Sequence, residues 1–472
     1  MIIIATLIVY FICLLCIAHL TVKHSSNANF FTAKHSSPWY MVAFGMIGAS
    51  VSGVTFVSVP GMVLTQQMTY LQTCMGFILG YFVVAYILLP IYKKAGLTSI
   101  YTFLQNRFGN RSYTTGACFF LLSKITGASI KFYVVCLILQ RFVLDTWHVP
   151  FVVTVTVLVL CIWLYTRRGG IRTLVWTDSF QTLCMIASLV VIMLKAMSLL
   201  HMDAYQTVQA ISSNPLSKIF EFNDWHSTQN FFKQFISGIF IVIVMTGLDQ
   251  DMMQKNLTCK TLKDAQKDMC SYGFAFLPIN FLLLALGILL VMFSTKSGIA
   301  LPANSDELML KFTAGGLMGP TVTVLFTIGI VAACFSSADS ALTSLTTCYC
   351  IDIRRQPDNE RLRKCTHFVM CIIFILFILL FNAINNDNLI NAVYTLVSYT
   401  YGPLLGLFGY GILCRKPVDD KLVPYIAVAS PLICWLLQTF AEKEFQYKFG
   451  YELLMLNGMI TATALWLTRK LN

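Results

Sequence analysis

A run of small and hydroxyl-bearing residues with one carboxylate lies inside a long apolar stretch, at residues 329–347 (GIVAACFSSADSALTSLTT). At helical spacing these side chains share one broad face, with Asp339 beside it. The face carries Ala333, Ser336, Ser337, Ser340, Ser344 and Thr347. A carboxylate in a membrane-spanning helix is costly and usually marks an ion or substrate pathway. The alternative is that small and hydroxyl residues only allow close packing of helices.

Oxygen ligands for a hard cation such as Na⁺ can come from hydroxyls, carboxylates and the carbonyls of an interrupted helix. Residues 38–64 contain Gly45, Gly48, Gly53 and Pro60, which predict such an interruption. Facing the hydroxyl-rich segment, this break would supply part of a sodium cage of three carbonyls and two hydroxyls. The predicted ligands are Gly48, Val51, Ala333, Ser336 and Ser337.

A second carboxylate, Asp178, also lies within an apolar span, about a turn and a half from Arg172. It either snorkels to the membrane surface or joins Asp339 and Ser340 in holding a second cation.

Two lysines, Lys124 and Lys131, lie seven residues apart in another apolar span and therefore share a helix face. A buried ammonium is costly unless it is paired. One of them is expected to meet an acidic substrate or an internal carboxylate such as Asp339. The alternative is an ion pair with no ligand role.

The composition indicates which elements hold these groups. The 472 residues are 57% hydrophobic and 11% charged, with a mean hydropathy of +0.72, far from the composition of a soluble domain. We predict an all-α polytopic membrane protein with one transmembrane domain over residues 1–472 and thirteen spans. The predicted spans are residues 2–22, 38–64, 67–92, 113–143, 150–166, 173–199, 229–248, 268–294, 318–349, 366–382, 389–412, 422–439 and 449–468.

The net charge of +12 arises from Lys and Arg spread over short loops and not collected in one patch. This distribution argues against a nucleic-acid partner. It instead predicts how the chain is oriented in the membrane. Most basic residues face the cytoplasm if the N-terminus is outside and the C-terminus cytoplasmic, in a cell (inner) membrane. The first apolar run is expected to be an uncleaved helix.

A second predicted interruption follows five spans after the first. Residues 236–254 contain Gly238 and Gly247, followed by Asp249, Gln250 and Asp251. Two interrupted helices at corresponding positions are typical of transporters built from two inverted repeats. We therefore predict five-helix repeats at residues 38–200 and 229–412, with residues 1–22 and 422–468 as peripheral helices.

Five ordered segments resemble the sodium/solute symporter family, which includes sodium/glucose, proline, sialic acid and pantothenate symporters. The segments are LPIYKKAGLTSIYTFLQNRFGNR (89–111), GGIRTLVWTDSFQ (169–181), TGLDQDMMQKNLTCKTLKDAQKDM (246–269), AACFSSADSALTSLTT (332–347) and YTYGPLLGLF (399–408). In the third segment Lys255 stands where the family usually has Arg.

The resemblance implies a LeuT-like 5+5 inverted-repeat fold and sodium-coupled uptake by alternating access. It places the family's sodium site on the cage residues above, and an additional sodium site on Asp178, Asp339 and Ser340. By position, Thr55, Tyr70, Cys74 and Thr246 resemble residues that line the central cavity. The polar groups of the sugar transporters are mostly absent, because Val54, Leu71 and Met245 are apolar.

These observations predict a symporter that imports a small organic solute with Na⁺. Lys124 favours a carboxylate-bearing solute such as a sialic acid, a monocarboxylate or an amino acid. The alternatives are a proton-coupled or sugar-transporting member of the same fold and a solute sensor. We expect a monomer in the lipid bilayer. The chain carries no Walker A phosphate loop and no zinc-spaced His or Cys cluster, so an enzyme is not expected.

Overall fold

The computed structural model describes residues 2–21, 26–384, 389–414, 416–447 and 449–468. Residue 22 at the end of the predicted first span, residues 385–388 in the predicted second repeat and residue 448 in the predicted peripheral range 422–468 lie outside this description. Within the described ranges the regular structure is helical, with a single isolated bridge between Ser37 and Cys259. The predicted all-α fold class is confirmed.

The described part of the chain contains nine continuous helices that are long and apolar enough to cross a membrane, and two further bent pairs. Two more helices, α18 (Leu389–Leu413) and α20 (Leu453–Leu467), occupy the remaining predicted positions. The total of thirteen spans stays a prediction. The nine continuous spans are α1 (Ile2–Thr21), α5 with α6 (Tyr70–Lys94), α8 with its π-helical end (Asn110–Phe142), α9 (Phe151–Gly169), α10 (Ile171–Leu200), α14 (Leu262–Ser297), α16 with its π-helical end (Pro320–Ile353), α17 (Glu360–Ile384) and α19 (Val423–Phe445). Short connecting helices are α2 (Asn27–Thr32), α7 (Thr102–Arg107), α11 (Ala204–Ser212) and α15 (Glu307–Thr313).

The first bent pair is α3 (Trp39–Ser50) and α4 (Gly53–Gln66), which meet at 62°. Val51 has a non-helical ψ of 76°, and Ser52 is extended and caps α4. Glycines flank the break because neighbouring helices approach closely. A Cβ on Gly48 would lie 2.1 Å from the hydroxyl of Thr182, and one on Gly53 would lie 1.9 Å from the thiol of Cys334. The predicted interruption is therefore present.

The second bent pair is α12 (Phe231–Val242), extended by a π-helical turn to Gly247, and α13 (Gln250–Leu257), which meet at 66°. Asp249 caps α13 and accepts a hydrogen bond from the amide of Asp251 at 2.8 Å. Every residue of α13 is buried. The Gln254 amide donates to the carbonyl of Phe31 at 2.8 Å and to the hydroxyl of Thr347 at 2.9 Å, which fixes α13 against α2 and α16.

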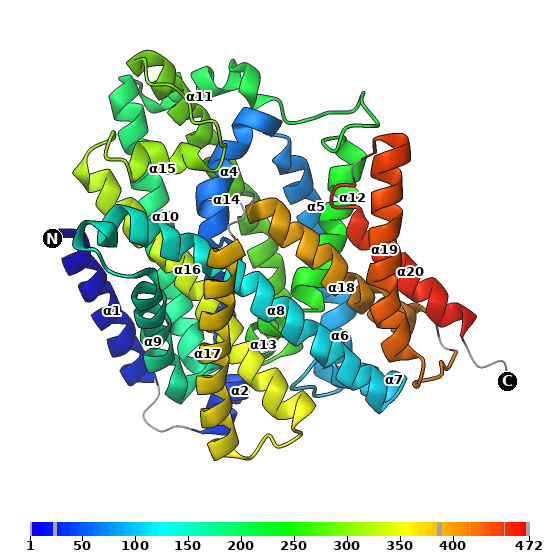
Figure 1. Ribbon diagram of the computed structural model, residues 1–472. Helices are drawn as coiled ribbons and strands as arrows, with labels where there is room; N and C mark the ends of the chain where they lie inside the picture. The colour runs from blue at the N-terminus through cyan, green and yellow to red at the C-terminus, as the bar shows by residue number, and fades with distance from the viewer. Residues whose placement is uncertain (1, 22–25, 385–388, 415, 448, 469–472) are drawn as a thin grey trace.

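Three helices, α3, α10 and α16, meet at the break of the first bent pair. α10 packs against both α3 and α16, and α16 also contacts α3, α4 and α13. The broken helix, the helix of Asp178 and the hydroxyl-rich helix are thus neighbours. Figure 1 shows α1 at one side of the bundle and α19 and α20 at the other.

Candidate functional site

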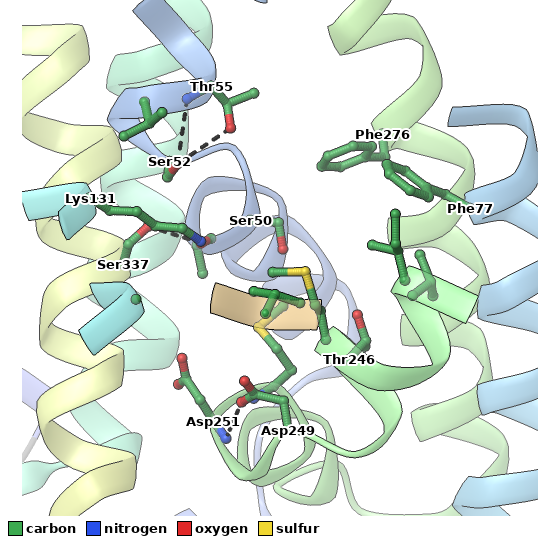
Figure 2. Close-up of a pocket in the computed structure, with 18 of the residues that line it drawn as sticks. Ser50, Ser52, Thr55, Phe77, Lys131, Thr246, Asp249, Asp251, Phe276 and Ser337 are labelled. Carbon is green, nitrogen blue, oxygen red and sulfur yellow. Dashed lines mark hydrogen bonds between the residues drawn. The ribbon is translucent and has the colours of Figure 1, made fainter. Parts of the chain in front are cut away.

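A cavity of about 160 Å³ lies between the two broken helices, with walls from α5, α8, α14, α16 and α18 (Figure 2). Four residues predicted to contact substrate line it: Thr55, Tyr70, Lys124 and Thr246. The fifth, Cys74, is buried and is not among the lining residues of the described chain. Cys74 lies between Tyr70 and Phe77 on α5. Their rings contact each other with centroids 6.4 Å apart, and both residues line the cavity.

The predicted sodium cage lies beside this cavity, where α16 meets the break in the first bent pair. The Ser337 hydroxyl donates to the carbonyl of Ala49 at 3.0 Å and to that of Ala333 at 3.2 Å, and Ser337 also lines the cavity. Gly48 lies in the last turn of α3 and Val51 in the break, where the helix ends and its carbonyls lose their regular amide partners. The geometry thus gathers carbonyl and hydroxyl oxygens at the boundary of the cavity.

The fifth cage residue, Ser336, also contacts a carboxylate that was not predicted to be its partner. Its hydroxyl donates to Asp178 Oδ1 at 3.0 Å, so it links the cage to the carboxylate of α10. The other oxygen of that carboxylate is 2.6 Å from the Lys255 ammonium, and both side chains are at most 2% exposed. Asp178 is therefore an internal ion-pair partner and does not snorkel to the surface.

The other two residues of the predicted second cation site lie next to this pair on α16. Asp339 accepts a hydrogen bond from the Tyr165 hydroxyl at 2.6 Å through Oδ2. In the part of the chain that the structure describes, Asp339 Oδ1 and the Ser340 hydroxyl are buried without a hydrogen-bond partner. The prediction of a second Na⁺ at Asp178, Asp339 and Ser340 stays a prediction, and Lys255 already contacts one of its three residues.

Lys124 forms the ion pair that was the alternative to a ligand role. Its ammonium is 3.1 Å from Asp249 and 2.7 Å from Asp251, at the start of α13. The Tyr401 hydroxyl of α18 donates to Asp249 at 2.6 Å. One ammonium thus lies between two carboxylates and ties α8, α13 and α18 together at one end of the cavity.

Lys131, two turns further along α8, lines the same cavity without such a partner. Within the described residues its ammonium forms no ion pair and no hydrogen bond. Figure 2 shows the side chain extending toward the middle of the cavity, near Ser50 and Ser337 and away from Asp249 and Asp251. Of the two cavity lysines in the described chain, Lys131 is therefore the one whose ammonium is not already paired with a carboxylate.

Sequence reasoning did not predict the carboxylate partners of Lys124 and Lys255. The acidic pair after Gly247 was recognised as part of an interruption, but its contact with Lys124 spans more than 120 residues. The contact between Lys255 and Asp178 was not predicted either. The available signal was charge balance, because a buried ammonium is costly unless a carboxylate lies beside it.

Comparison with known proteins agrees with this arrangement. A family model described as the Sodium:solute symporter family matches residues 30–418. The sodium/sialic acid symporter NanT of Aliivibrio fischeri is 25% identical over 454 residues, which cover 93% of this chain and 88% of that protein. The sodium/sialic acid symporter SiaT of Proteus mirabilis is 25% identical over 436 residues, covering 86% and 83%.

Solved structures show the same fold. A Na⁺-coupled sialic acid symporter, in a substrate-bound outward-open state, superposes with a TM-score of 0.85 at 21% identity, covering 99% of this chain and 97% of that one. The nucleobase-cation symporter Mhp1, in a closed conformation, superposes with a TM-score of 0.56 at 13% identity, covering 93% of each chain. The fold is LeuT-like, and the chain belongs to the Sodium:solute symporter family.

Proposed function

We propose that this protein imports a small carboxylate-bearing solute with Na⁺ across the cell (inner) membrane, and that Lys131 binds the carboxylate. Family membership makes the protein a sodium-coupled symporter of a small solute, with Na⁺ as the co-transported ion. The nature of the solute is the new part of the proposal. Sialic acids are the first compounds to test, because the similar proteins NanT and SiaT are sodium/sialic acid symporters.

The observation that carries the proposal is the unpaired ammonium in the cavity. A cation out of bulk water is stabilised by an opposite charge or by hydrogen bonds. Lys124 has two carboxylates, whereas Lys131 is left for a ligand. The apolar rings of Tyr70, Phe77 and Phe276 form other parts of the wall. A solute with one carboxylate and a less polar body matches this distribution of groups.

The sodium cage supports coupling because Ser337 belongs to both sites. Na⁺ bound by Gly48, Val51, Ala333, Ser336 and Ser337 would hold the break of the first bent pair against α16. That contact would also fix one wall of the solute cavity. If the affinity for Na⁺ differs between the outward and inward states, Na⁺ binding shifts the equilibrium between these two states. We propose residues 38–200 and 229–412 as the two inverted repeats of the fold.

We further propose that the N-terminus is outside, that the C-terminus is cytoplasmic and that the protein functions as a monomer. The orientation is supported by the excess of Lys and Arg in the segments that it places in the cytoplasm.

Uptake into proteoliposomes tests the function. With an inward Na⁺ gradient we expect accumulation of a carboxylate solute from a panel of sialic acids, monocarboxylates and amino acids. Unlabelled carboxylates should compete, and their neutral amides should not. Replacing Na⁺ by K⁺ should abolish accumulation. Equal uptake in sodium-free buffer would contradict sodium coupling, and better competition by neutral analogues would contradict the assignment of the solute.

Substitution Ser337→Ala tests the sodium cage. Removing one neutral hydroxyl ligand is expected to cost about 0.5–1.5 kcal/mol, so the Na⁺ concentration for half-maximal uptake should rise roughly twofold to tenfold. The matched control is Ser344→Ala on the same helix, because the Ser344 hydroxyl bonds to the carbonyl of Ala341 within α16. If both variants keep the wild-type sodium dependence, Ser337 is not a ligand.

A further inference from the structure

A second cavity, of about 300 Å³, lies away from the transport pathway, between the end of α9, the start of α17 and the short helix α2. Four basic side chains line it: Arg167 and Arg168 from α9, and Arg363 and Lys364 from α17. With the orientation proposed above, these helix ends face the cytoplasm. None of the four residues belongs to the sodium cage or the solute cavity.

The charge of this basic cavity is only partly balanced. Glu360 is 3.4 Å from Lys364 and 4.0 Å from Arg363, and it is well exposed. Arg167 and Arg168 form no ion pair with any residue that the structure describes. Arg167 and Arg168 therefore give this concave site positive charge that no described carboxylate balances within ion-pair distance. Such a site attracts an anion, and several charges favour phosphate over a single carboxylate.

Three side chains in the wall of the basic cavity are held in place. Arg363 is fully buried, and its guanidinium lies over the Phe30 ring at 4.7 Å. The Arg167 guanidinium lies over the Trp163 ring at 4.8 Å. The His367 ring is fixed by the hydroxyls of Thr166 and Thr346, at 2.9 and 3.0 Å. A site held in this way loses little side-chain entropy when an anion binds.

The surface directly beyond the basic cavity is apolar. One turn or two toward the bilayer centre, α9 exposes Leu160 and Leu164, and α17 exposes Phe368 and Ile372. The rings of Trp163 and Phe368 are in contact, with centroids 5.8 Å apart, between the basic residues and this surface. The protein surface thus presents basic residues first, then an aromatic residue and then an apolar strip. This order matches a phospholipid at the membrane interface, whose charged headgroup is followed by its acyl chains.

We propose that the basic cavity binds the phosphate of an anionic phospholipid, whose acyl chains lie along the exposed strips of α9 and α17. A free phosphate compound would use the basic residues but not the apolar surface beyond them. The occupant would also bridge α9 and α17, which contact each other. The site is thus expected to stabilise this part of the bundle independently of the transported solute.

Thermal unfolding of the full-length protein in detergent tests the proposal. The probes are phosphatidylglycerol, phosphatidylcholine and inorganic phosphate, added separately. We expect phosphatidylglycerol to raise the Tm and the other two to leave it unchanged. The double variant Arg168→Gln/Lys364→Gln removes two cations from the cavity and should lower the affinity for phosphatidylglycerol by roughly tenfold to thirtyfold.

The matched control is Arg361→Gln/Lys260→Gln, which makes the same change in net charge at two exposed residues outside the cavity. It should keep the phosphatidylglycerol affinity of the wild type. Native mass spectrometry, counting retained phosphatidylglycerol molecules, provides a second readout for a variant of low stability. Equal phosphatidylglycerol binding by the cavity variant and the control would overturn the site. An equal Tm shift with inorganic phosphate would overturn the assignment of a lipid.

Discussion

Substitution Lys131→Gln is expected to raise the KM for the carboxylate-bearing solute by roughly tenfold to one-hundredfold. The variant removes the charge that would bind the carboxylate and keeps a polar side chain of similar length. A hydrogen bond to a charged group contributes about 1.5–3 kcal/mol, which corresponds to that range. Because Lys131 has no ion-pair partner in the described chain, its replacement leaves no carboxylate unpaired, and the Tm should change little.

Two further variants separate solute binding from a general loss of function. Lys131→Arg keeps the charge and should keep measurable uptake with a moderate increase in KM. Lys124→Gln should abolish uptake of every solute, since it removes the cation between Asp249 and Asp251. A wild-type KM in Lys131→Gln, measured at saturating Na⁺, would show that the carboxylate binds elsewhere or that the solute is neutral.

The two lysines show where sequence reasoning reaches its limit. Their spacing places both on one face of α8, so periodicity cannot distinguish them. The distinction comes from α13, where Asp249 and Asp251 contact Lys124 from a distant part of the chain. The prediction chose Lys124 as the residue that favours a carboxylate solute, whereas the structure leaves Lys131 accessible in the cavity.

Local features were easier to predict because their causes are local. Apolar runs of about 20 residues follow from the thickness of the bilayer, and they gave the positions of the helices. The break at Val51 lies between Gly48 and Gly53, where close contacts with α10 and α16 leave no space for a side chain. The orientation of Ser336 depends on where α10 places Asp178, and no local pattern contains that information.

The buried pair of Lys255 and Asp178 gives the second prediction with a large effect. The Lys255 ammonium, 2.6 Å from the carboxylate, already supplies a positive charge beside Asp178. Ser336 holds the other carboxylate oxygen. We therefore expect the wild-type protein to transport one Na⁺ per solute, with Lys255 as a permanent cation at this position. Measurement of the reversal potential, or of ²²Na⁺ and solute fluxes together, gives the ratio.

Substitution Lys255→Met should leave Asp178 as an unpaired buried carboxylate. Breaking a buried pair in this way costs about 3–5 kcal/mol, so the variant should unfold at a much lower temperature in sodium-free buffer. Asp178, Asp339 and Ser340 then provide oxygen ligands for a Na⁺ ion in place of the ammonium. Increasing Na⁺ should raise the Tm of Lys255→Met far more steeply than that of the wild type, and any remaining uptake should require a second Na⁺.

The double variant Asp178→Asn/Lys255→Met separates this exchange of cations from simple damage to the core. It removes both charges, so it should recover most of the stability that Lys255→Met loses, because no unpaired ion remains. Its Tm should also lose the steep dependence on Na⁺. Lys255→Arg, which preserves the ion pair, should keep the wild-type ratio of Na⁺ to solute. A wild-type ratio of two, falling to one in Asp178→Asn, would instead show that a second Na⁺ binds beside Lys255 and that both cations share the carboxylate.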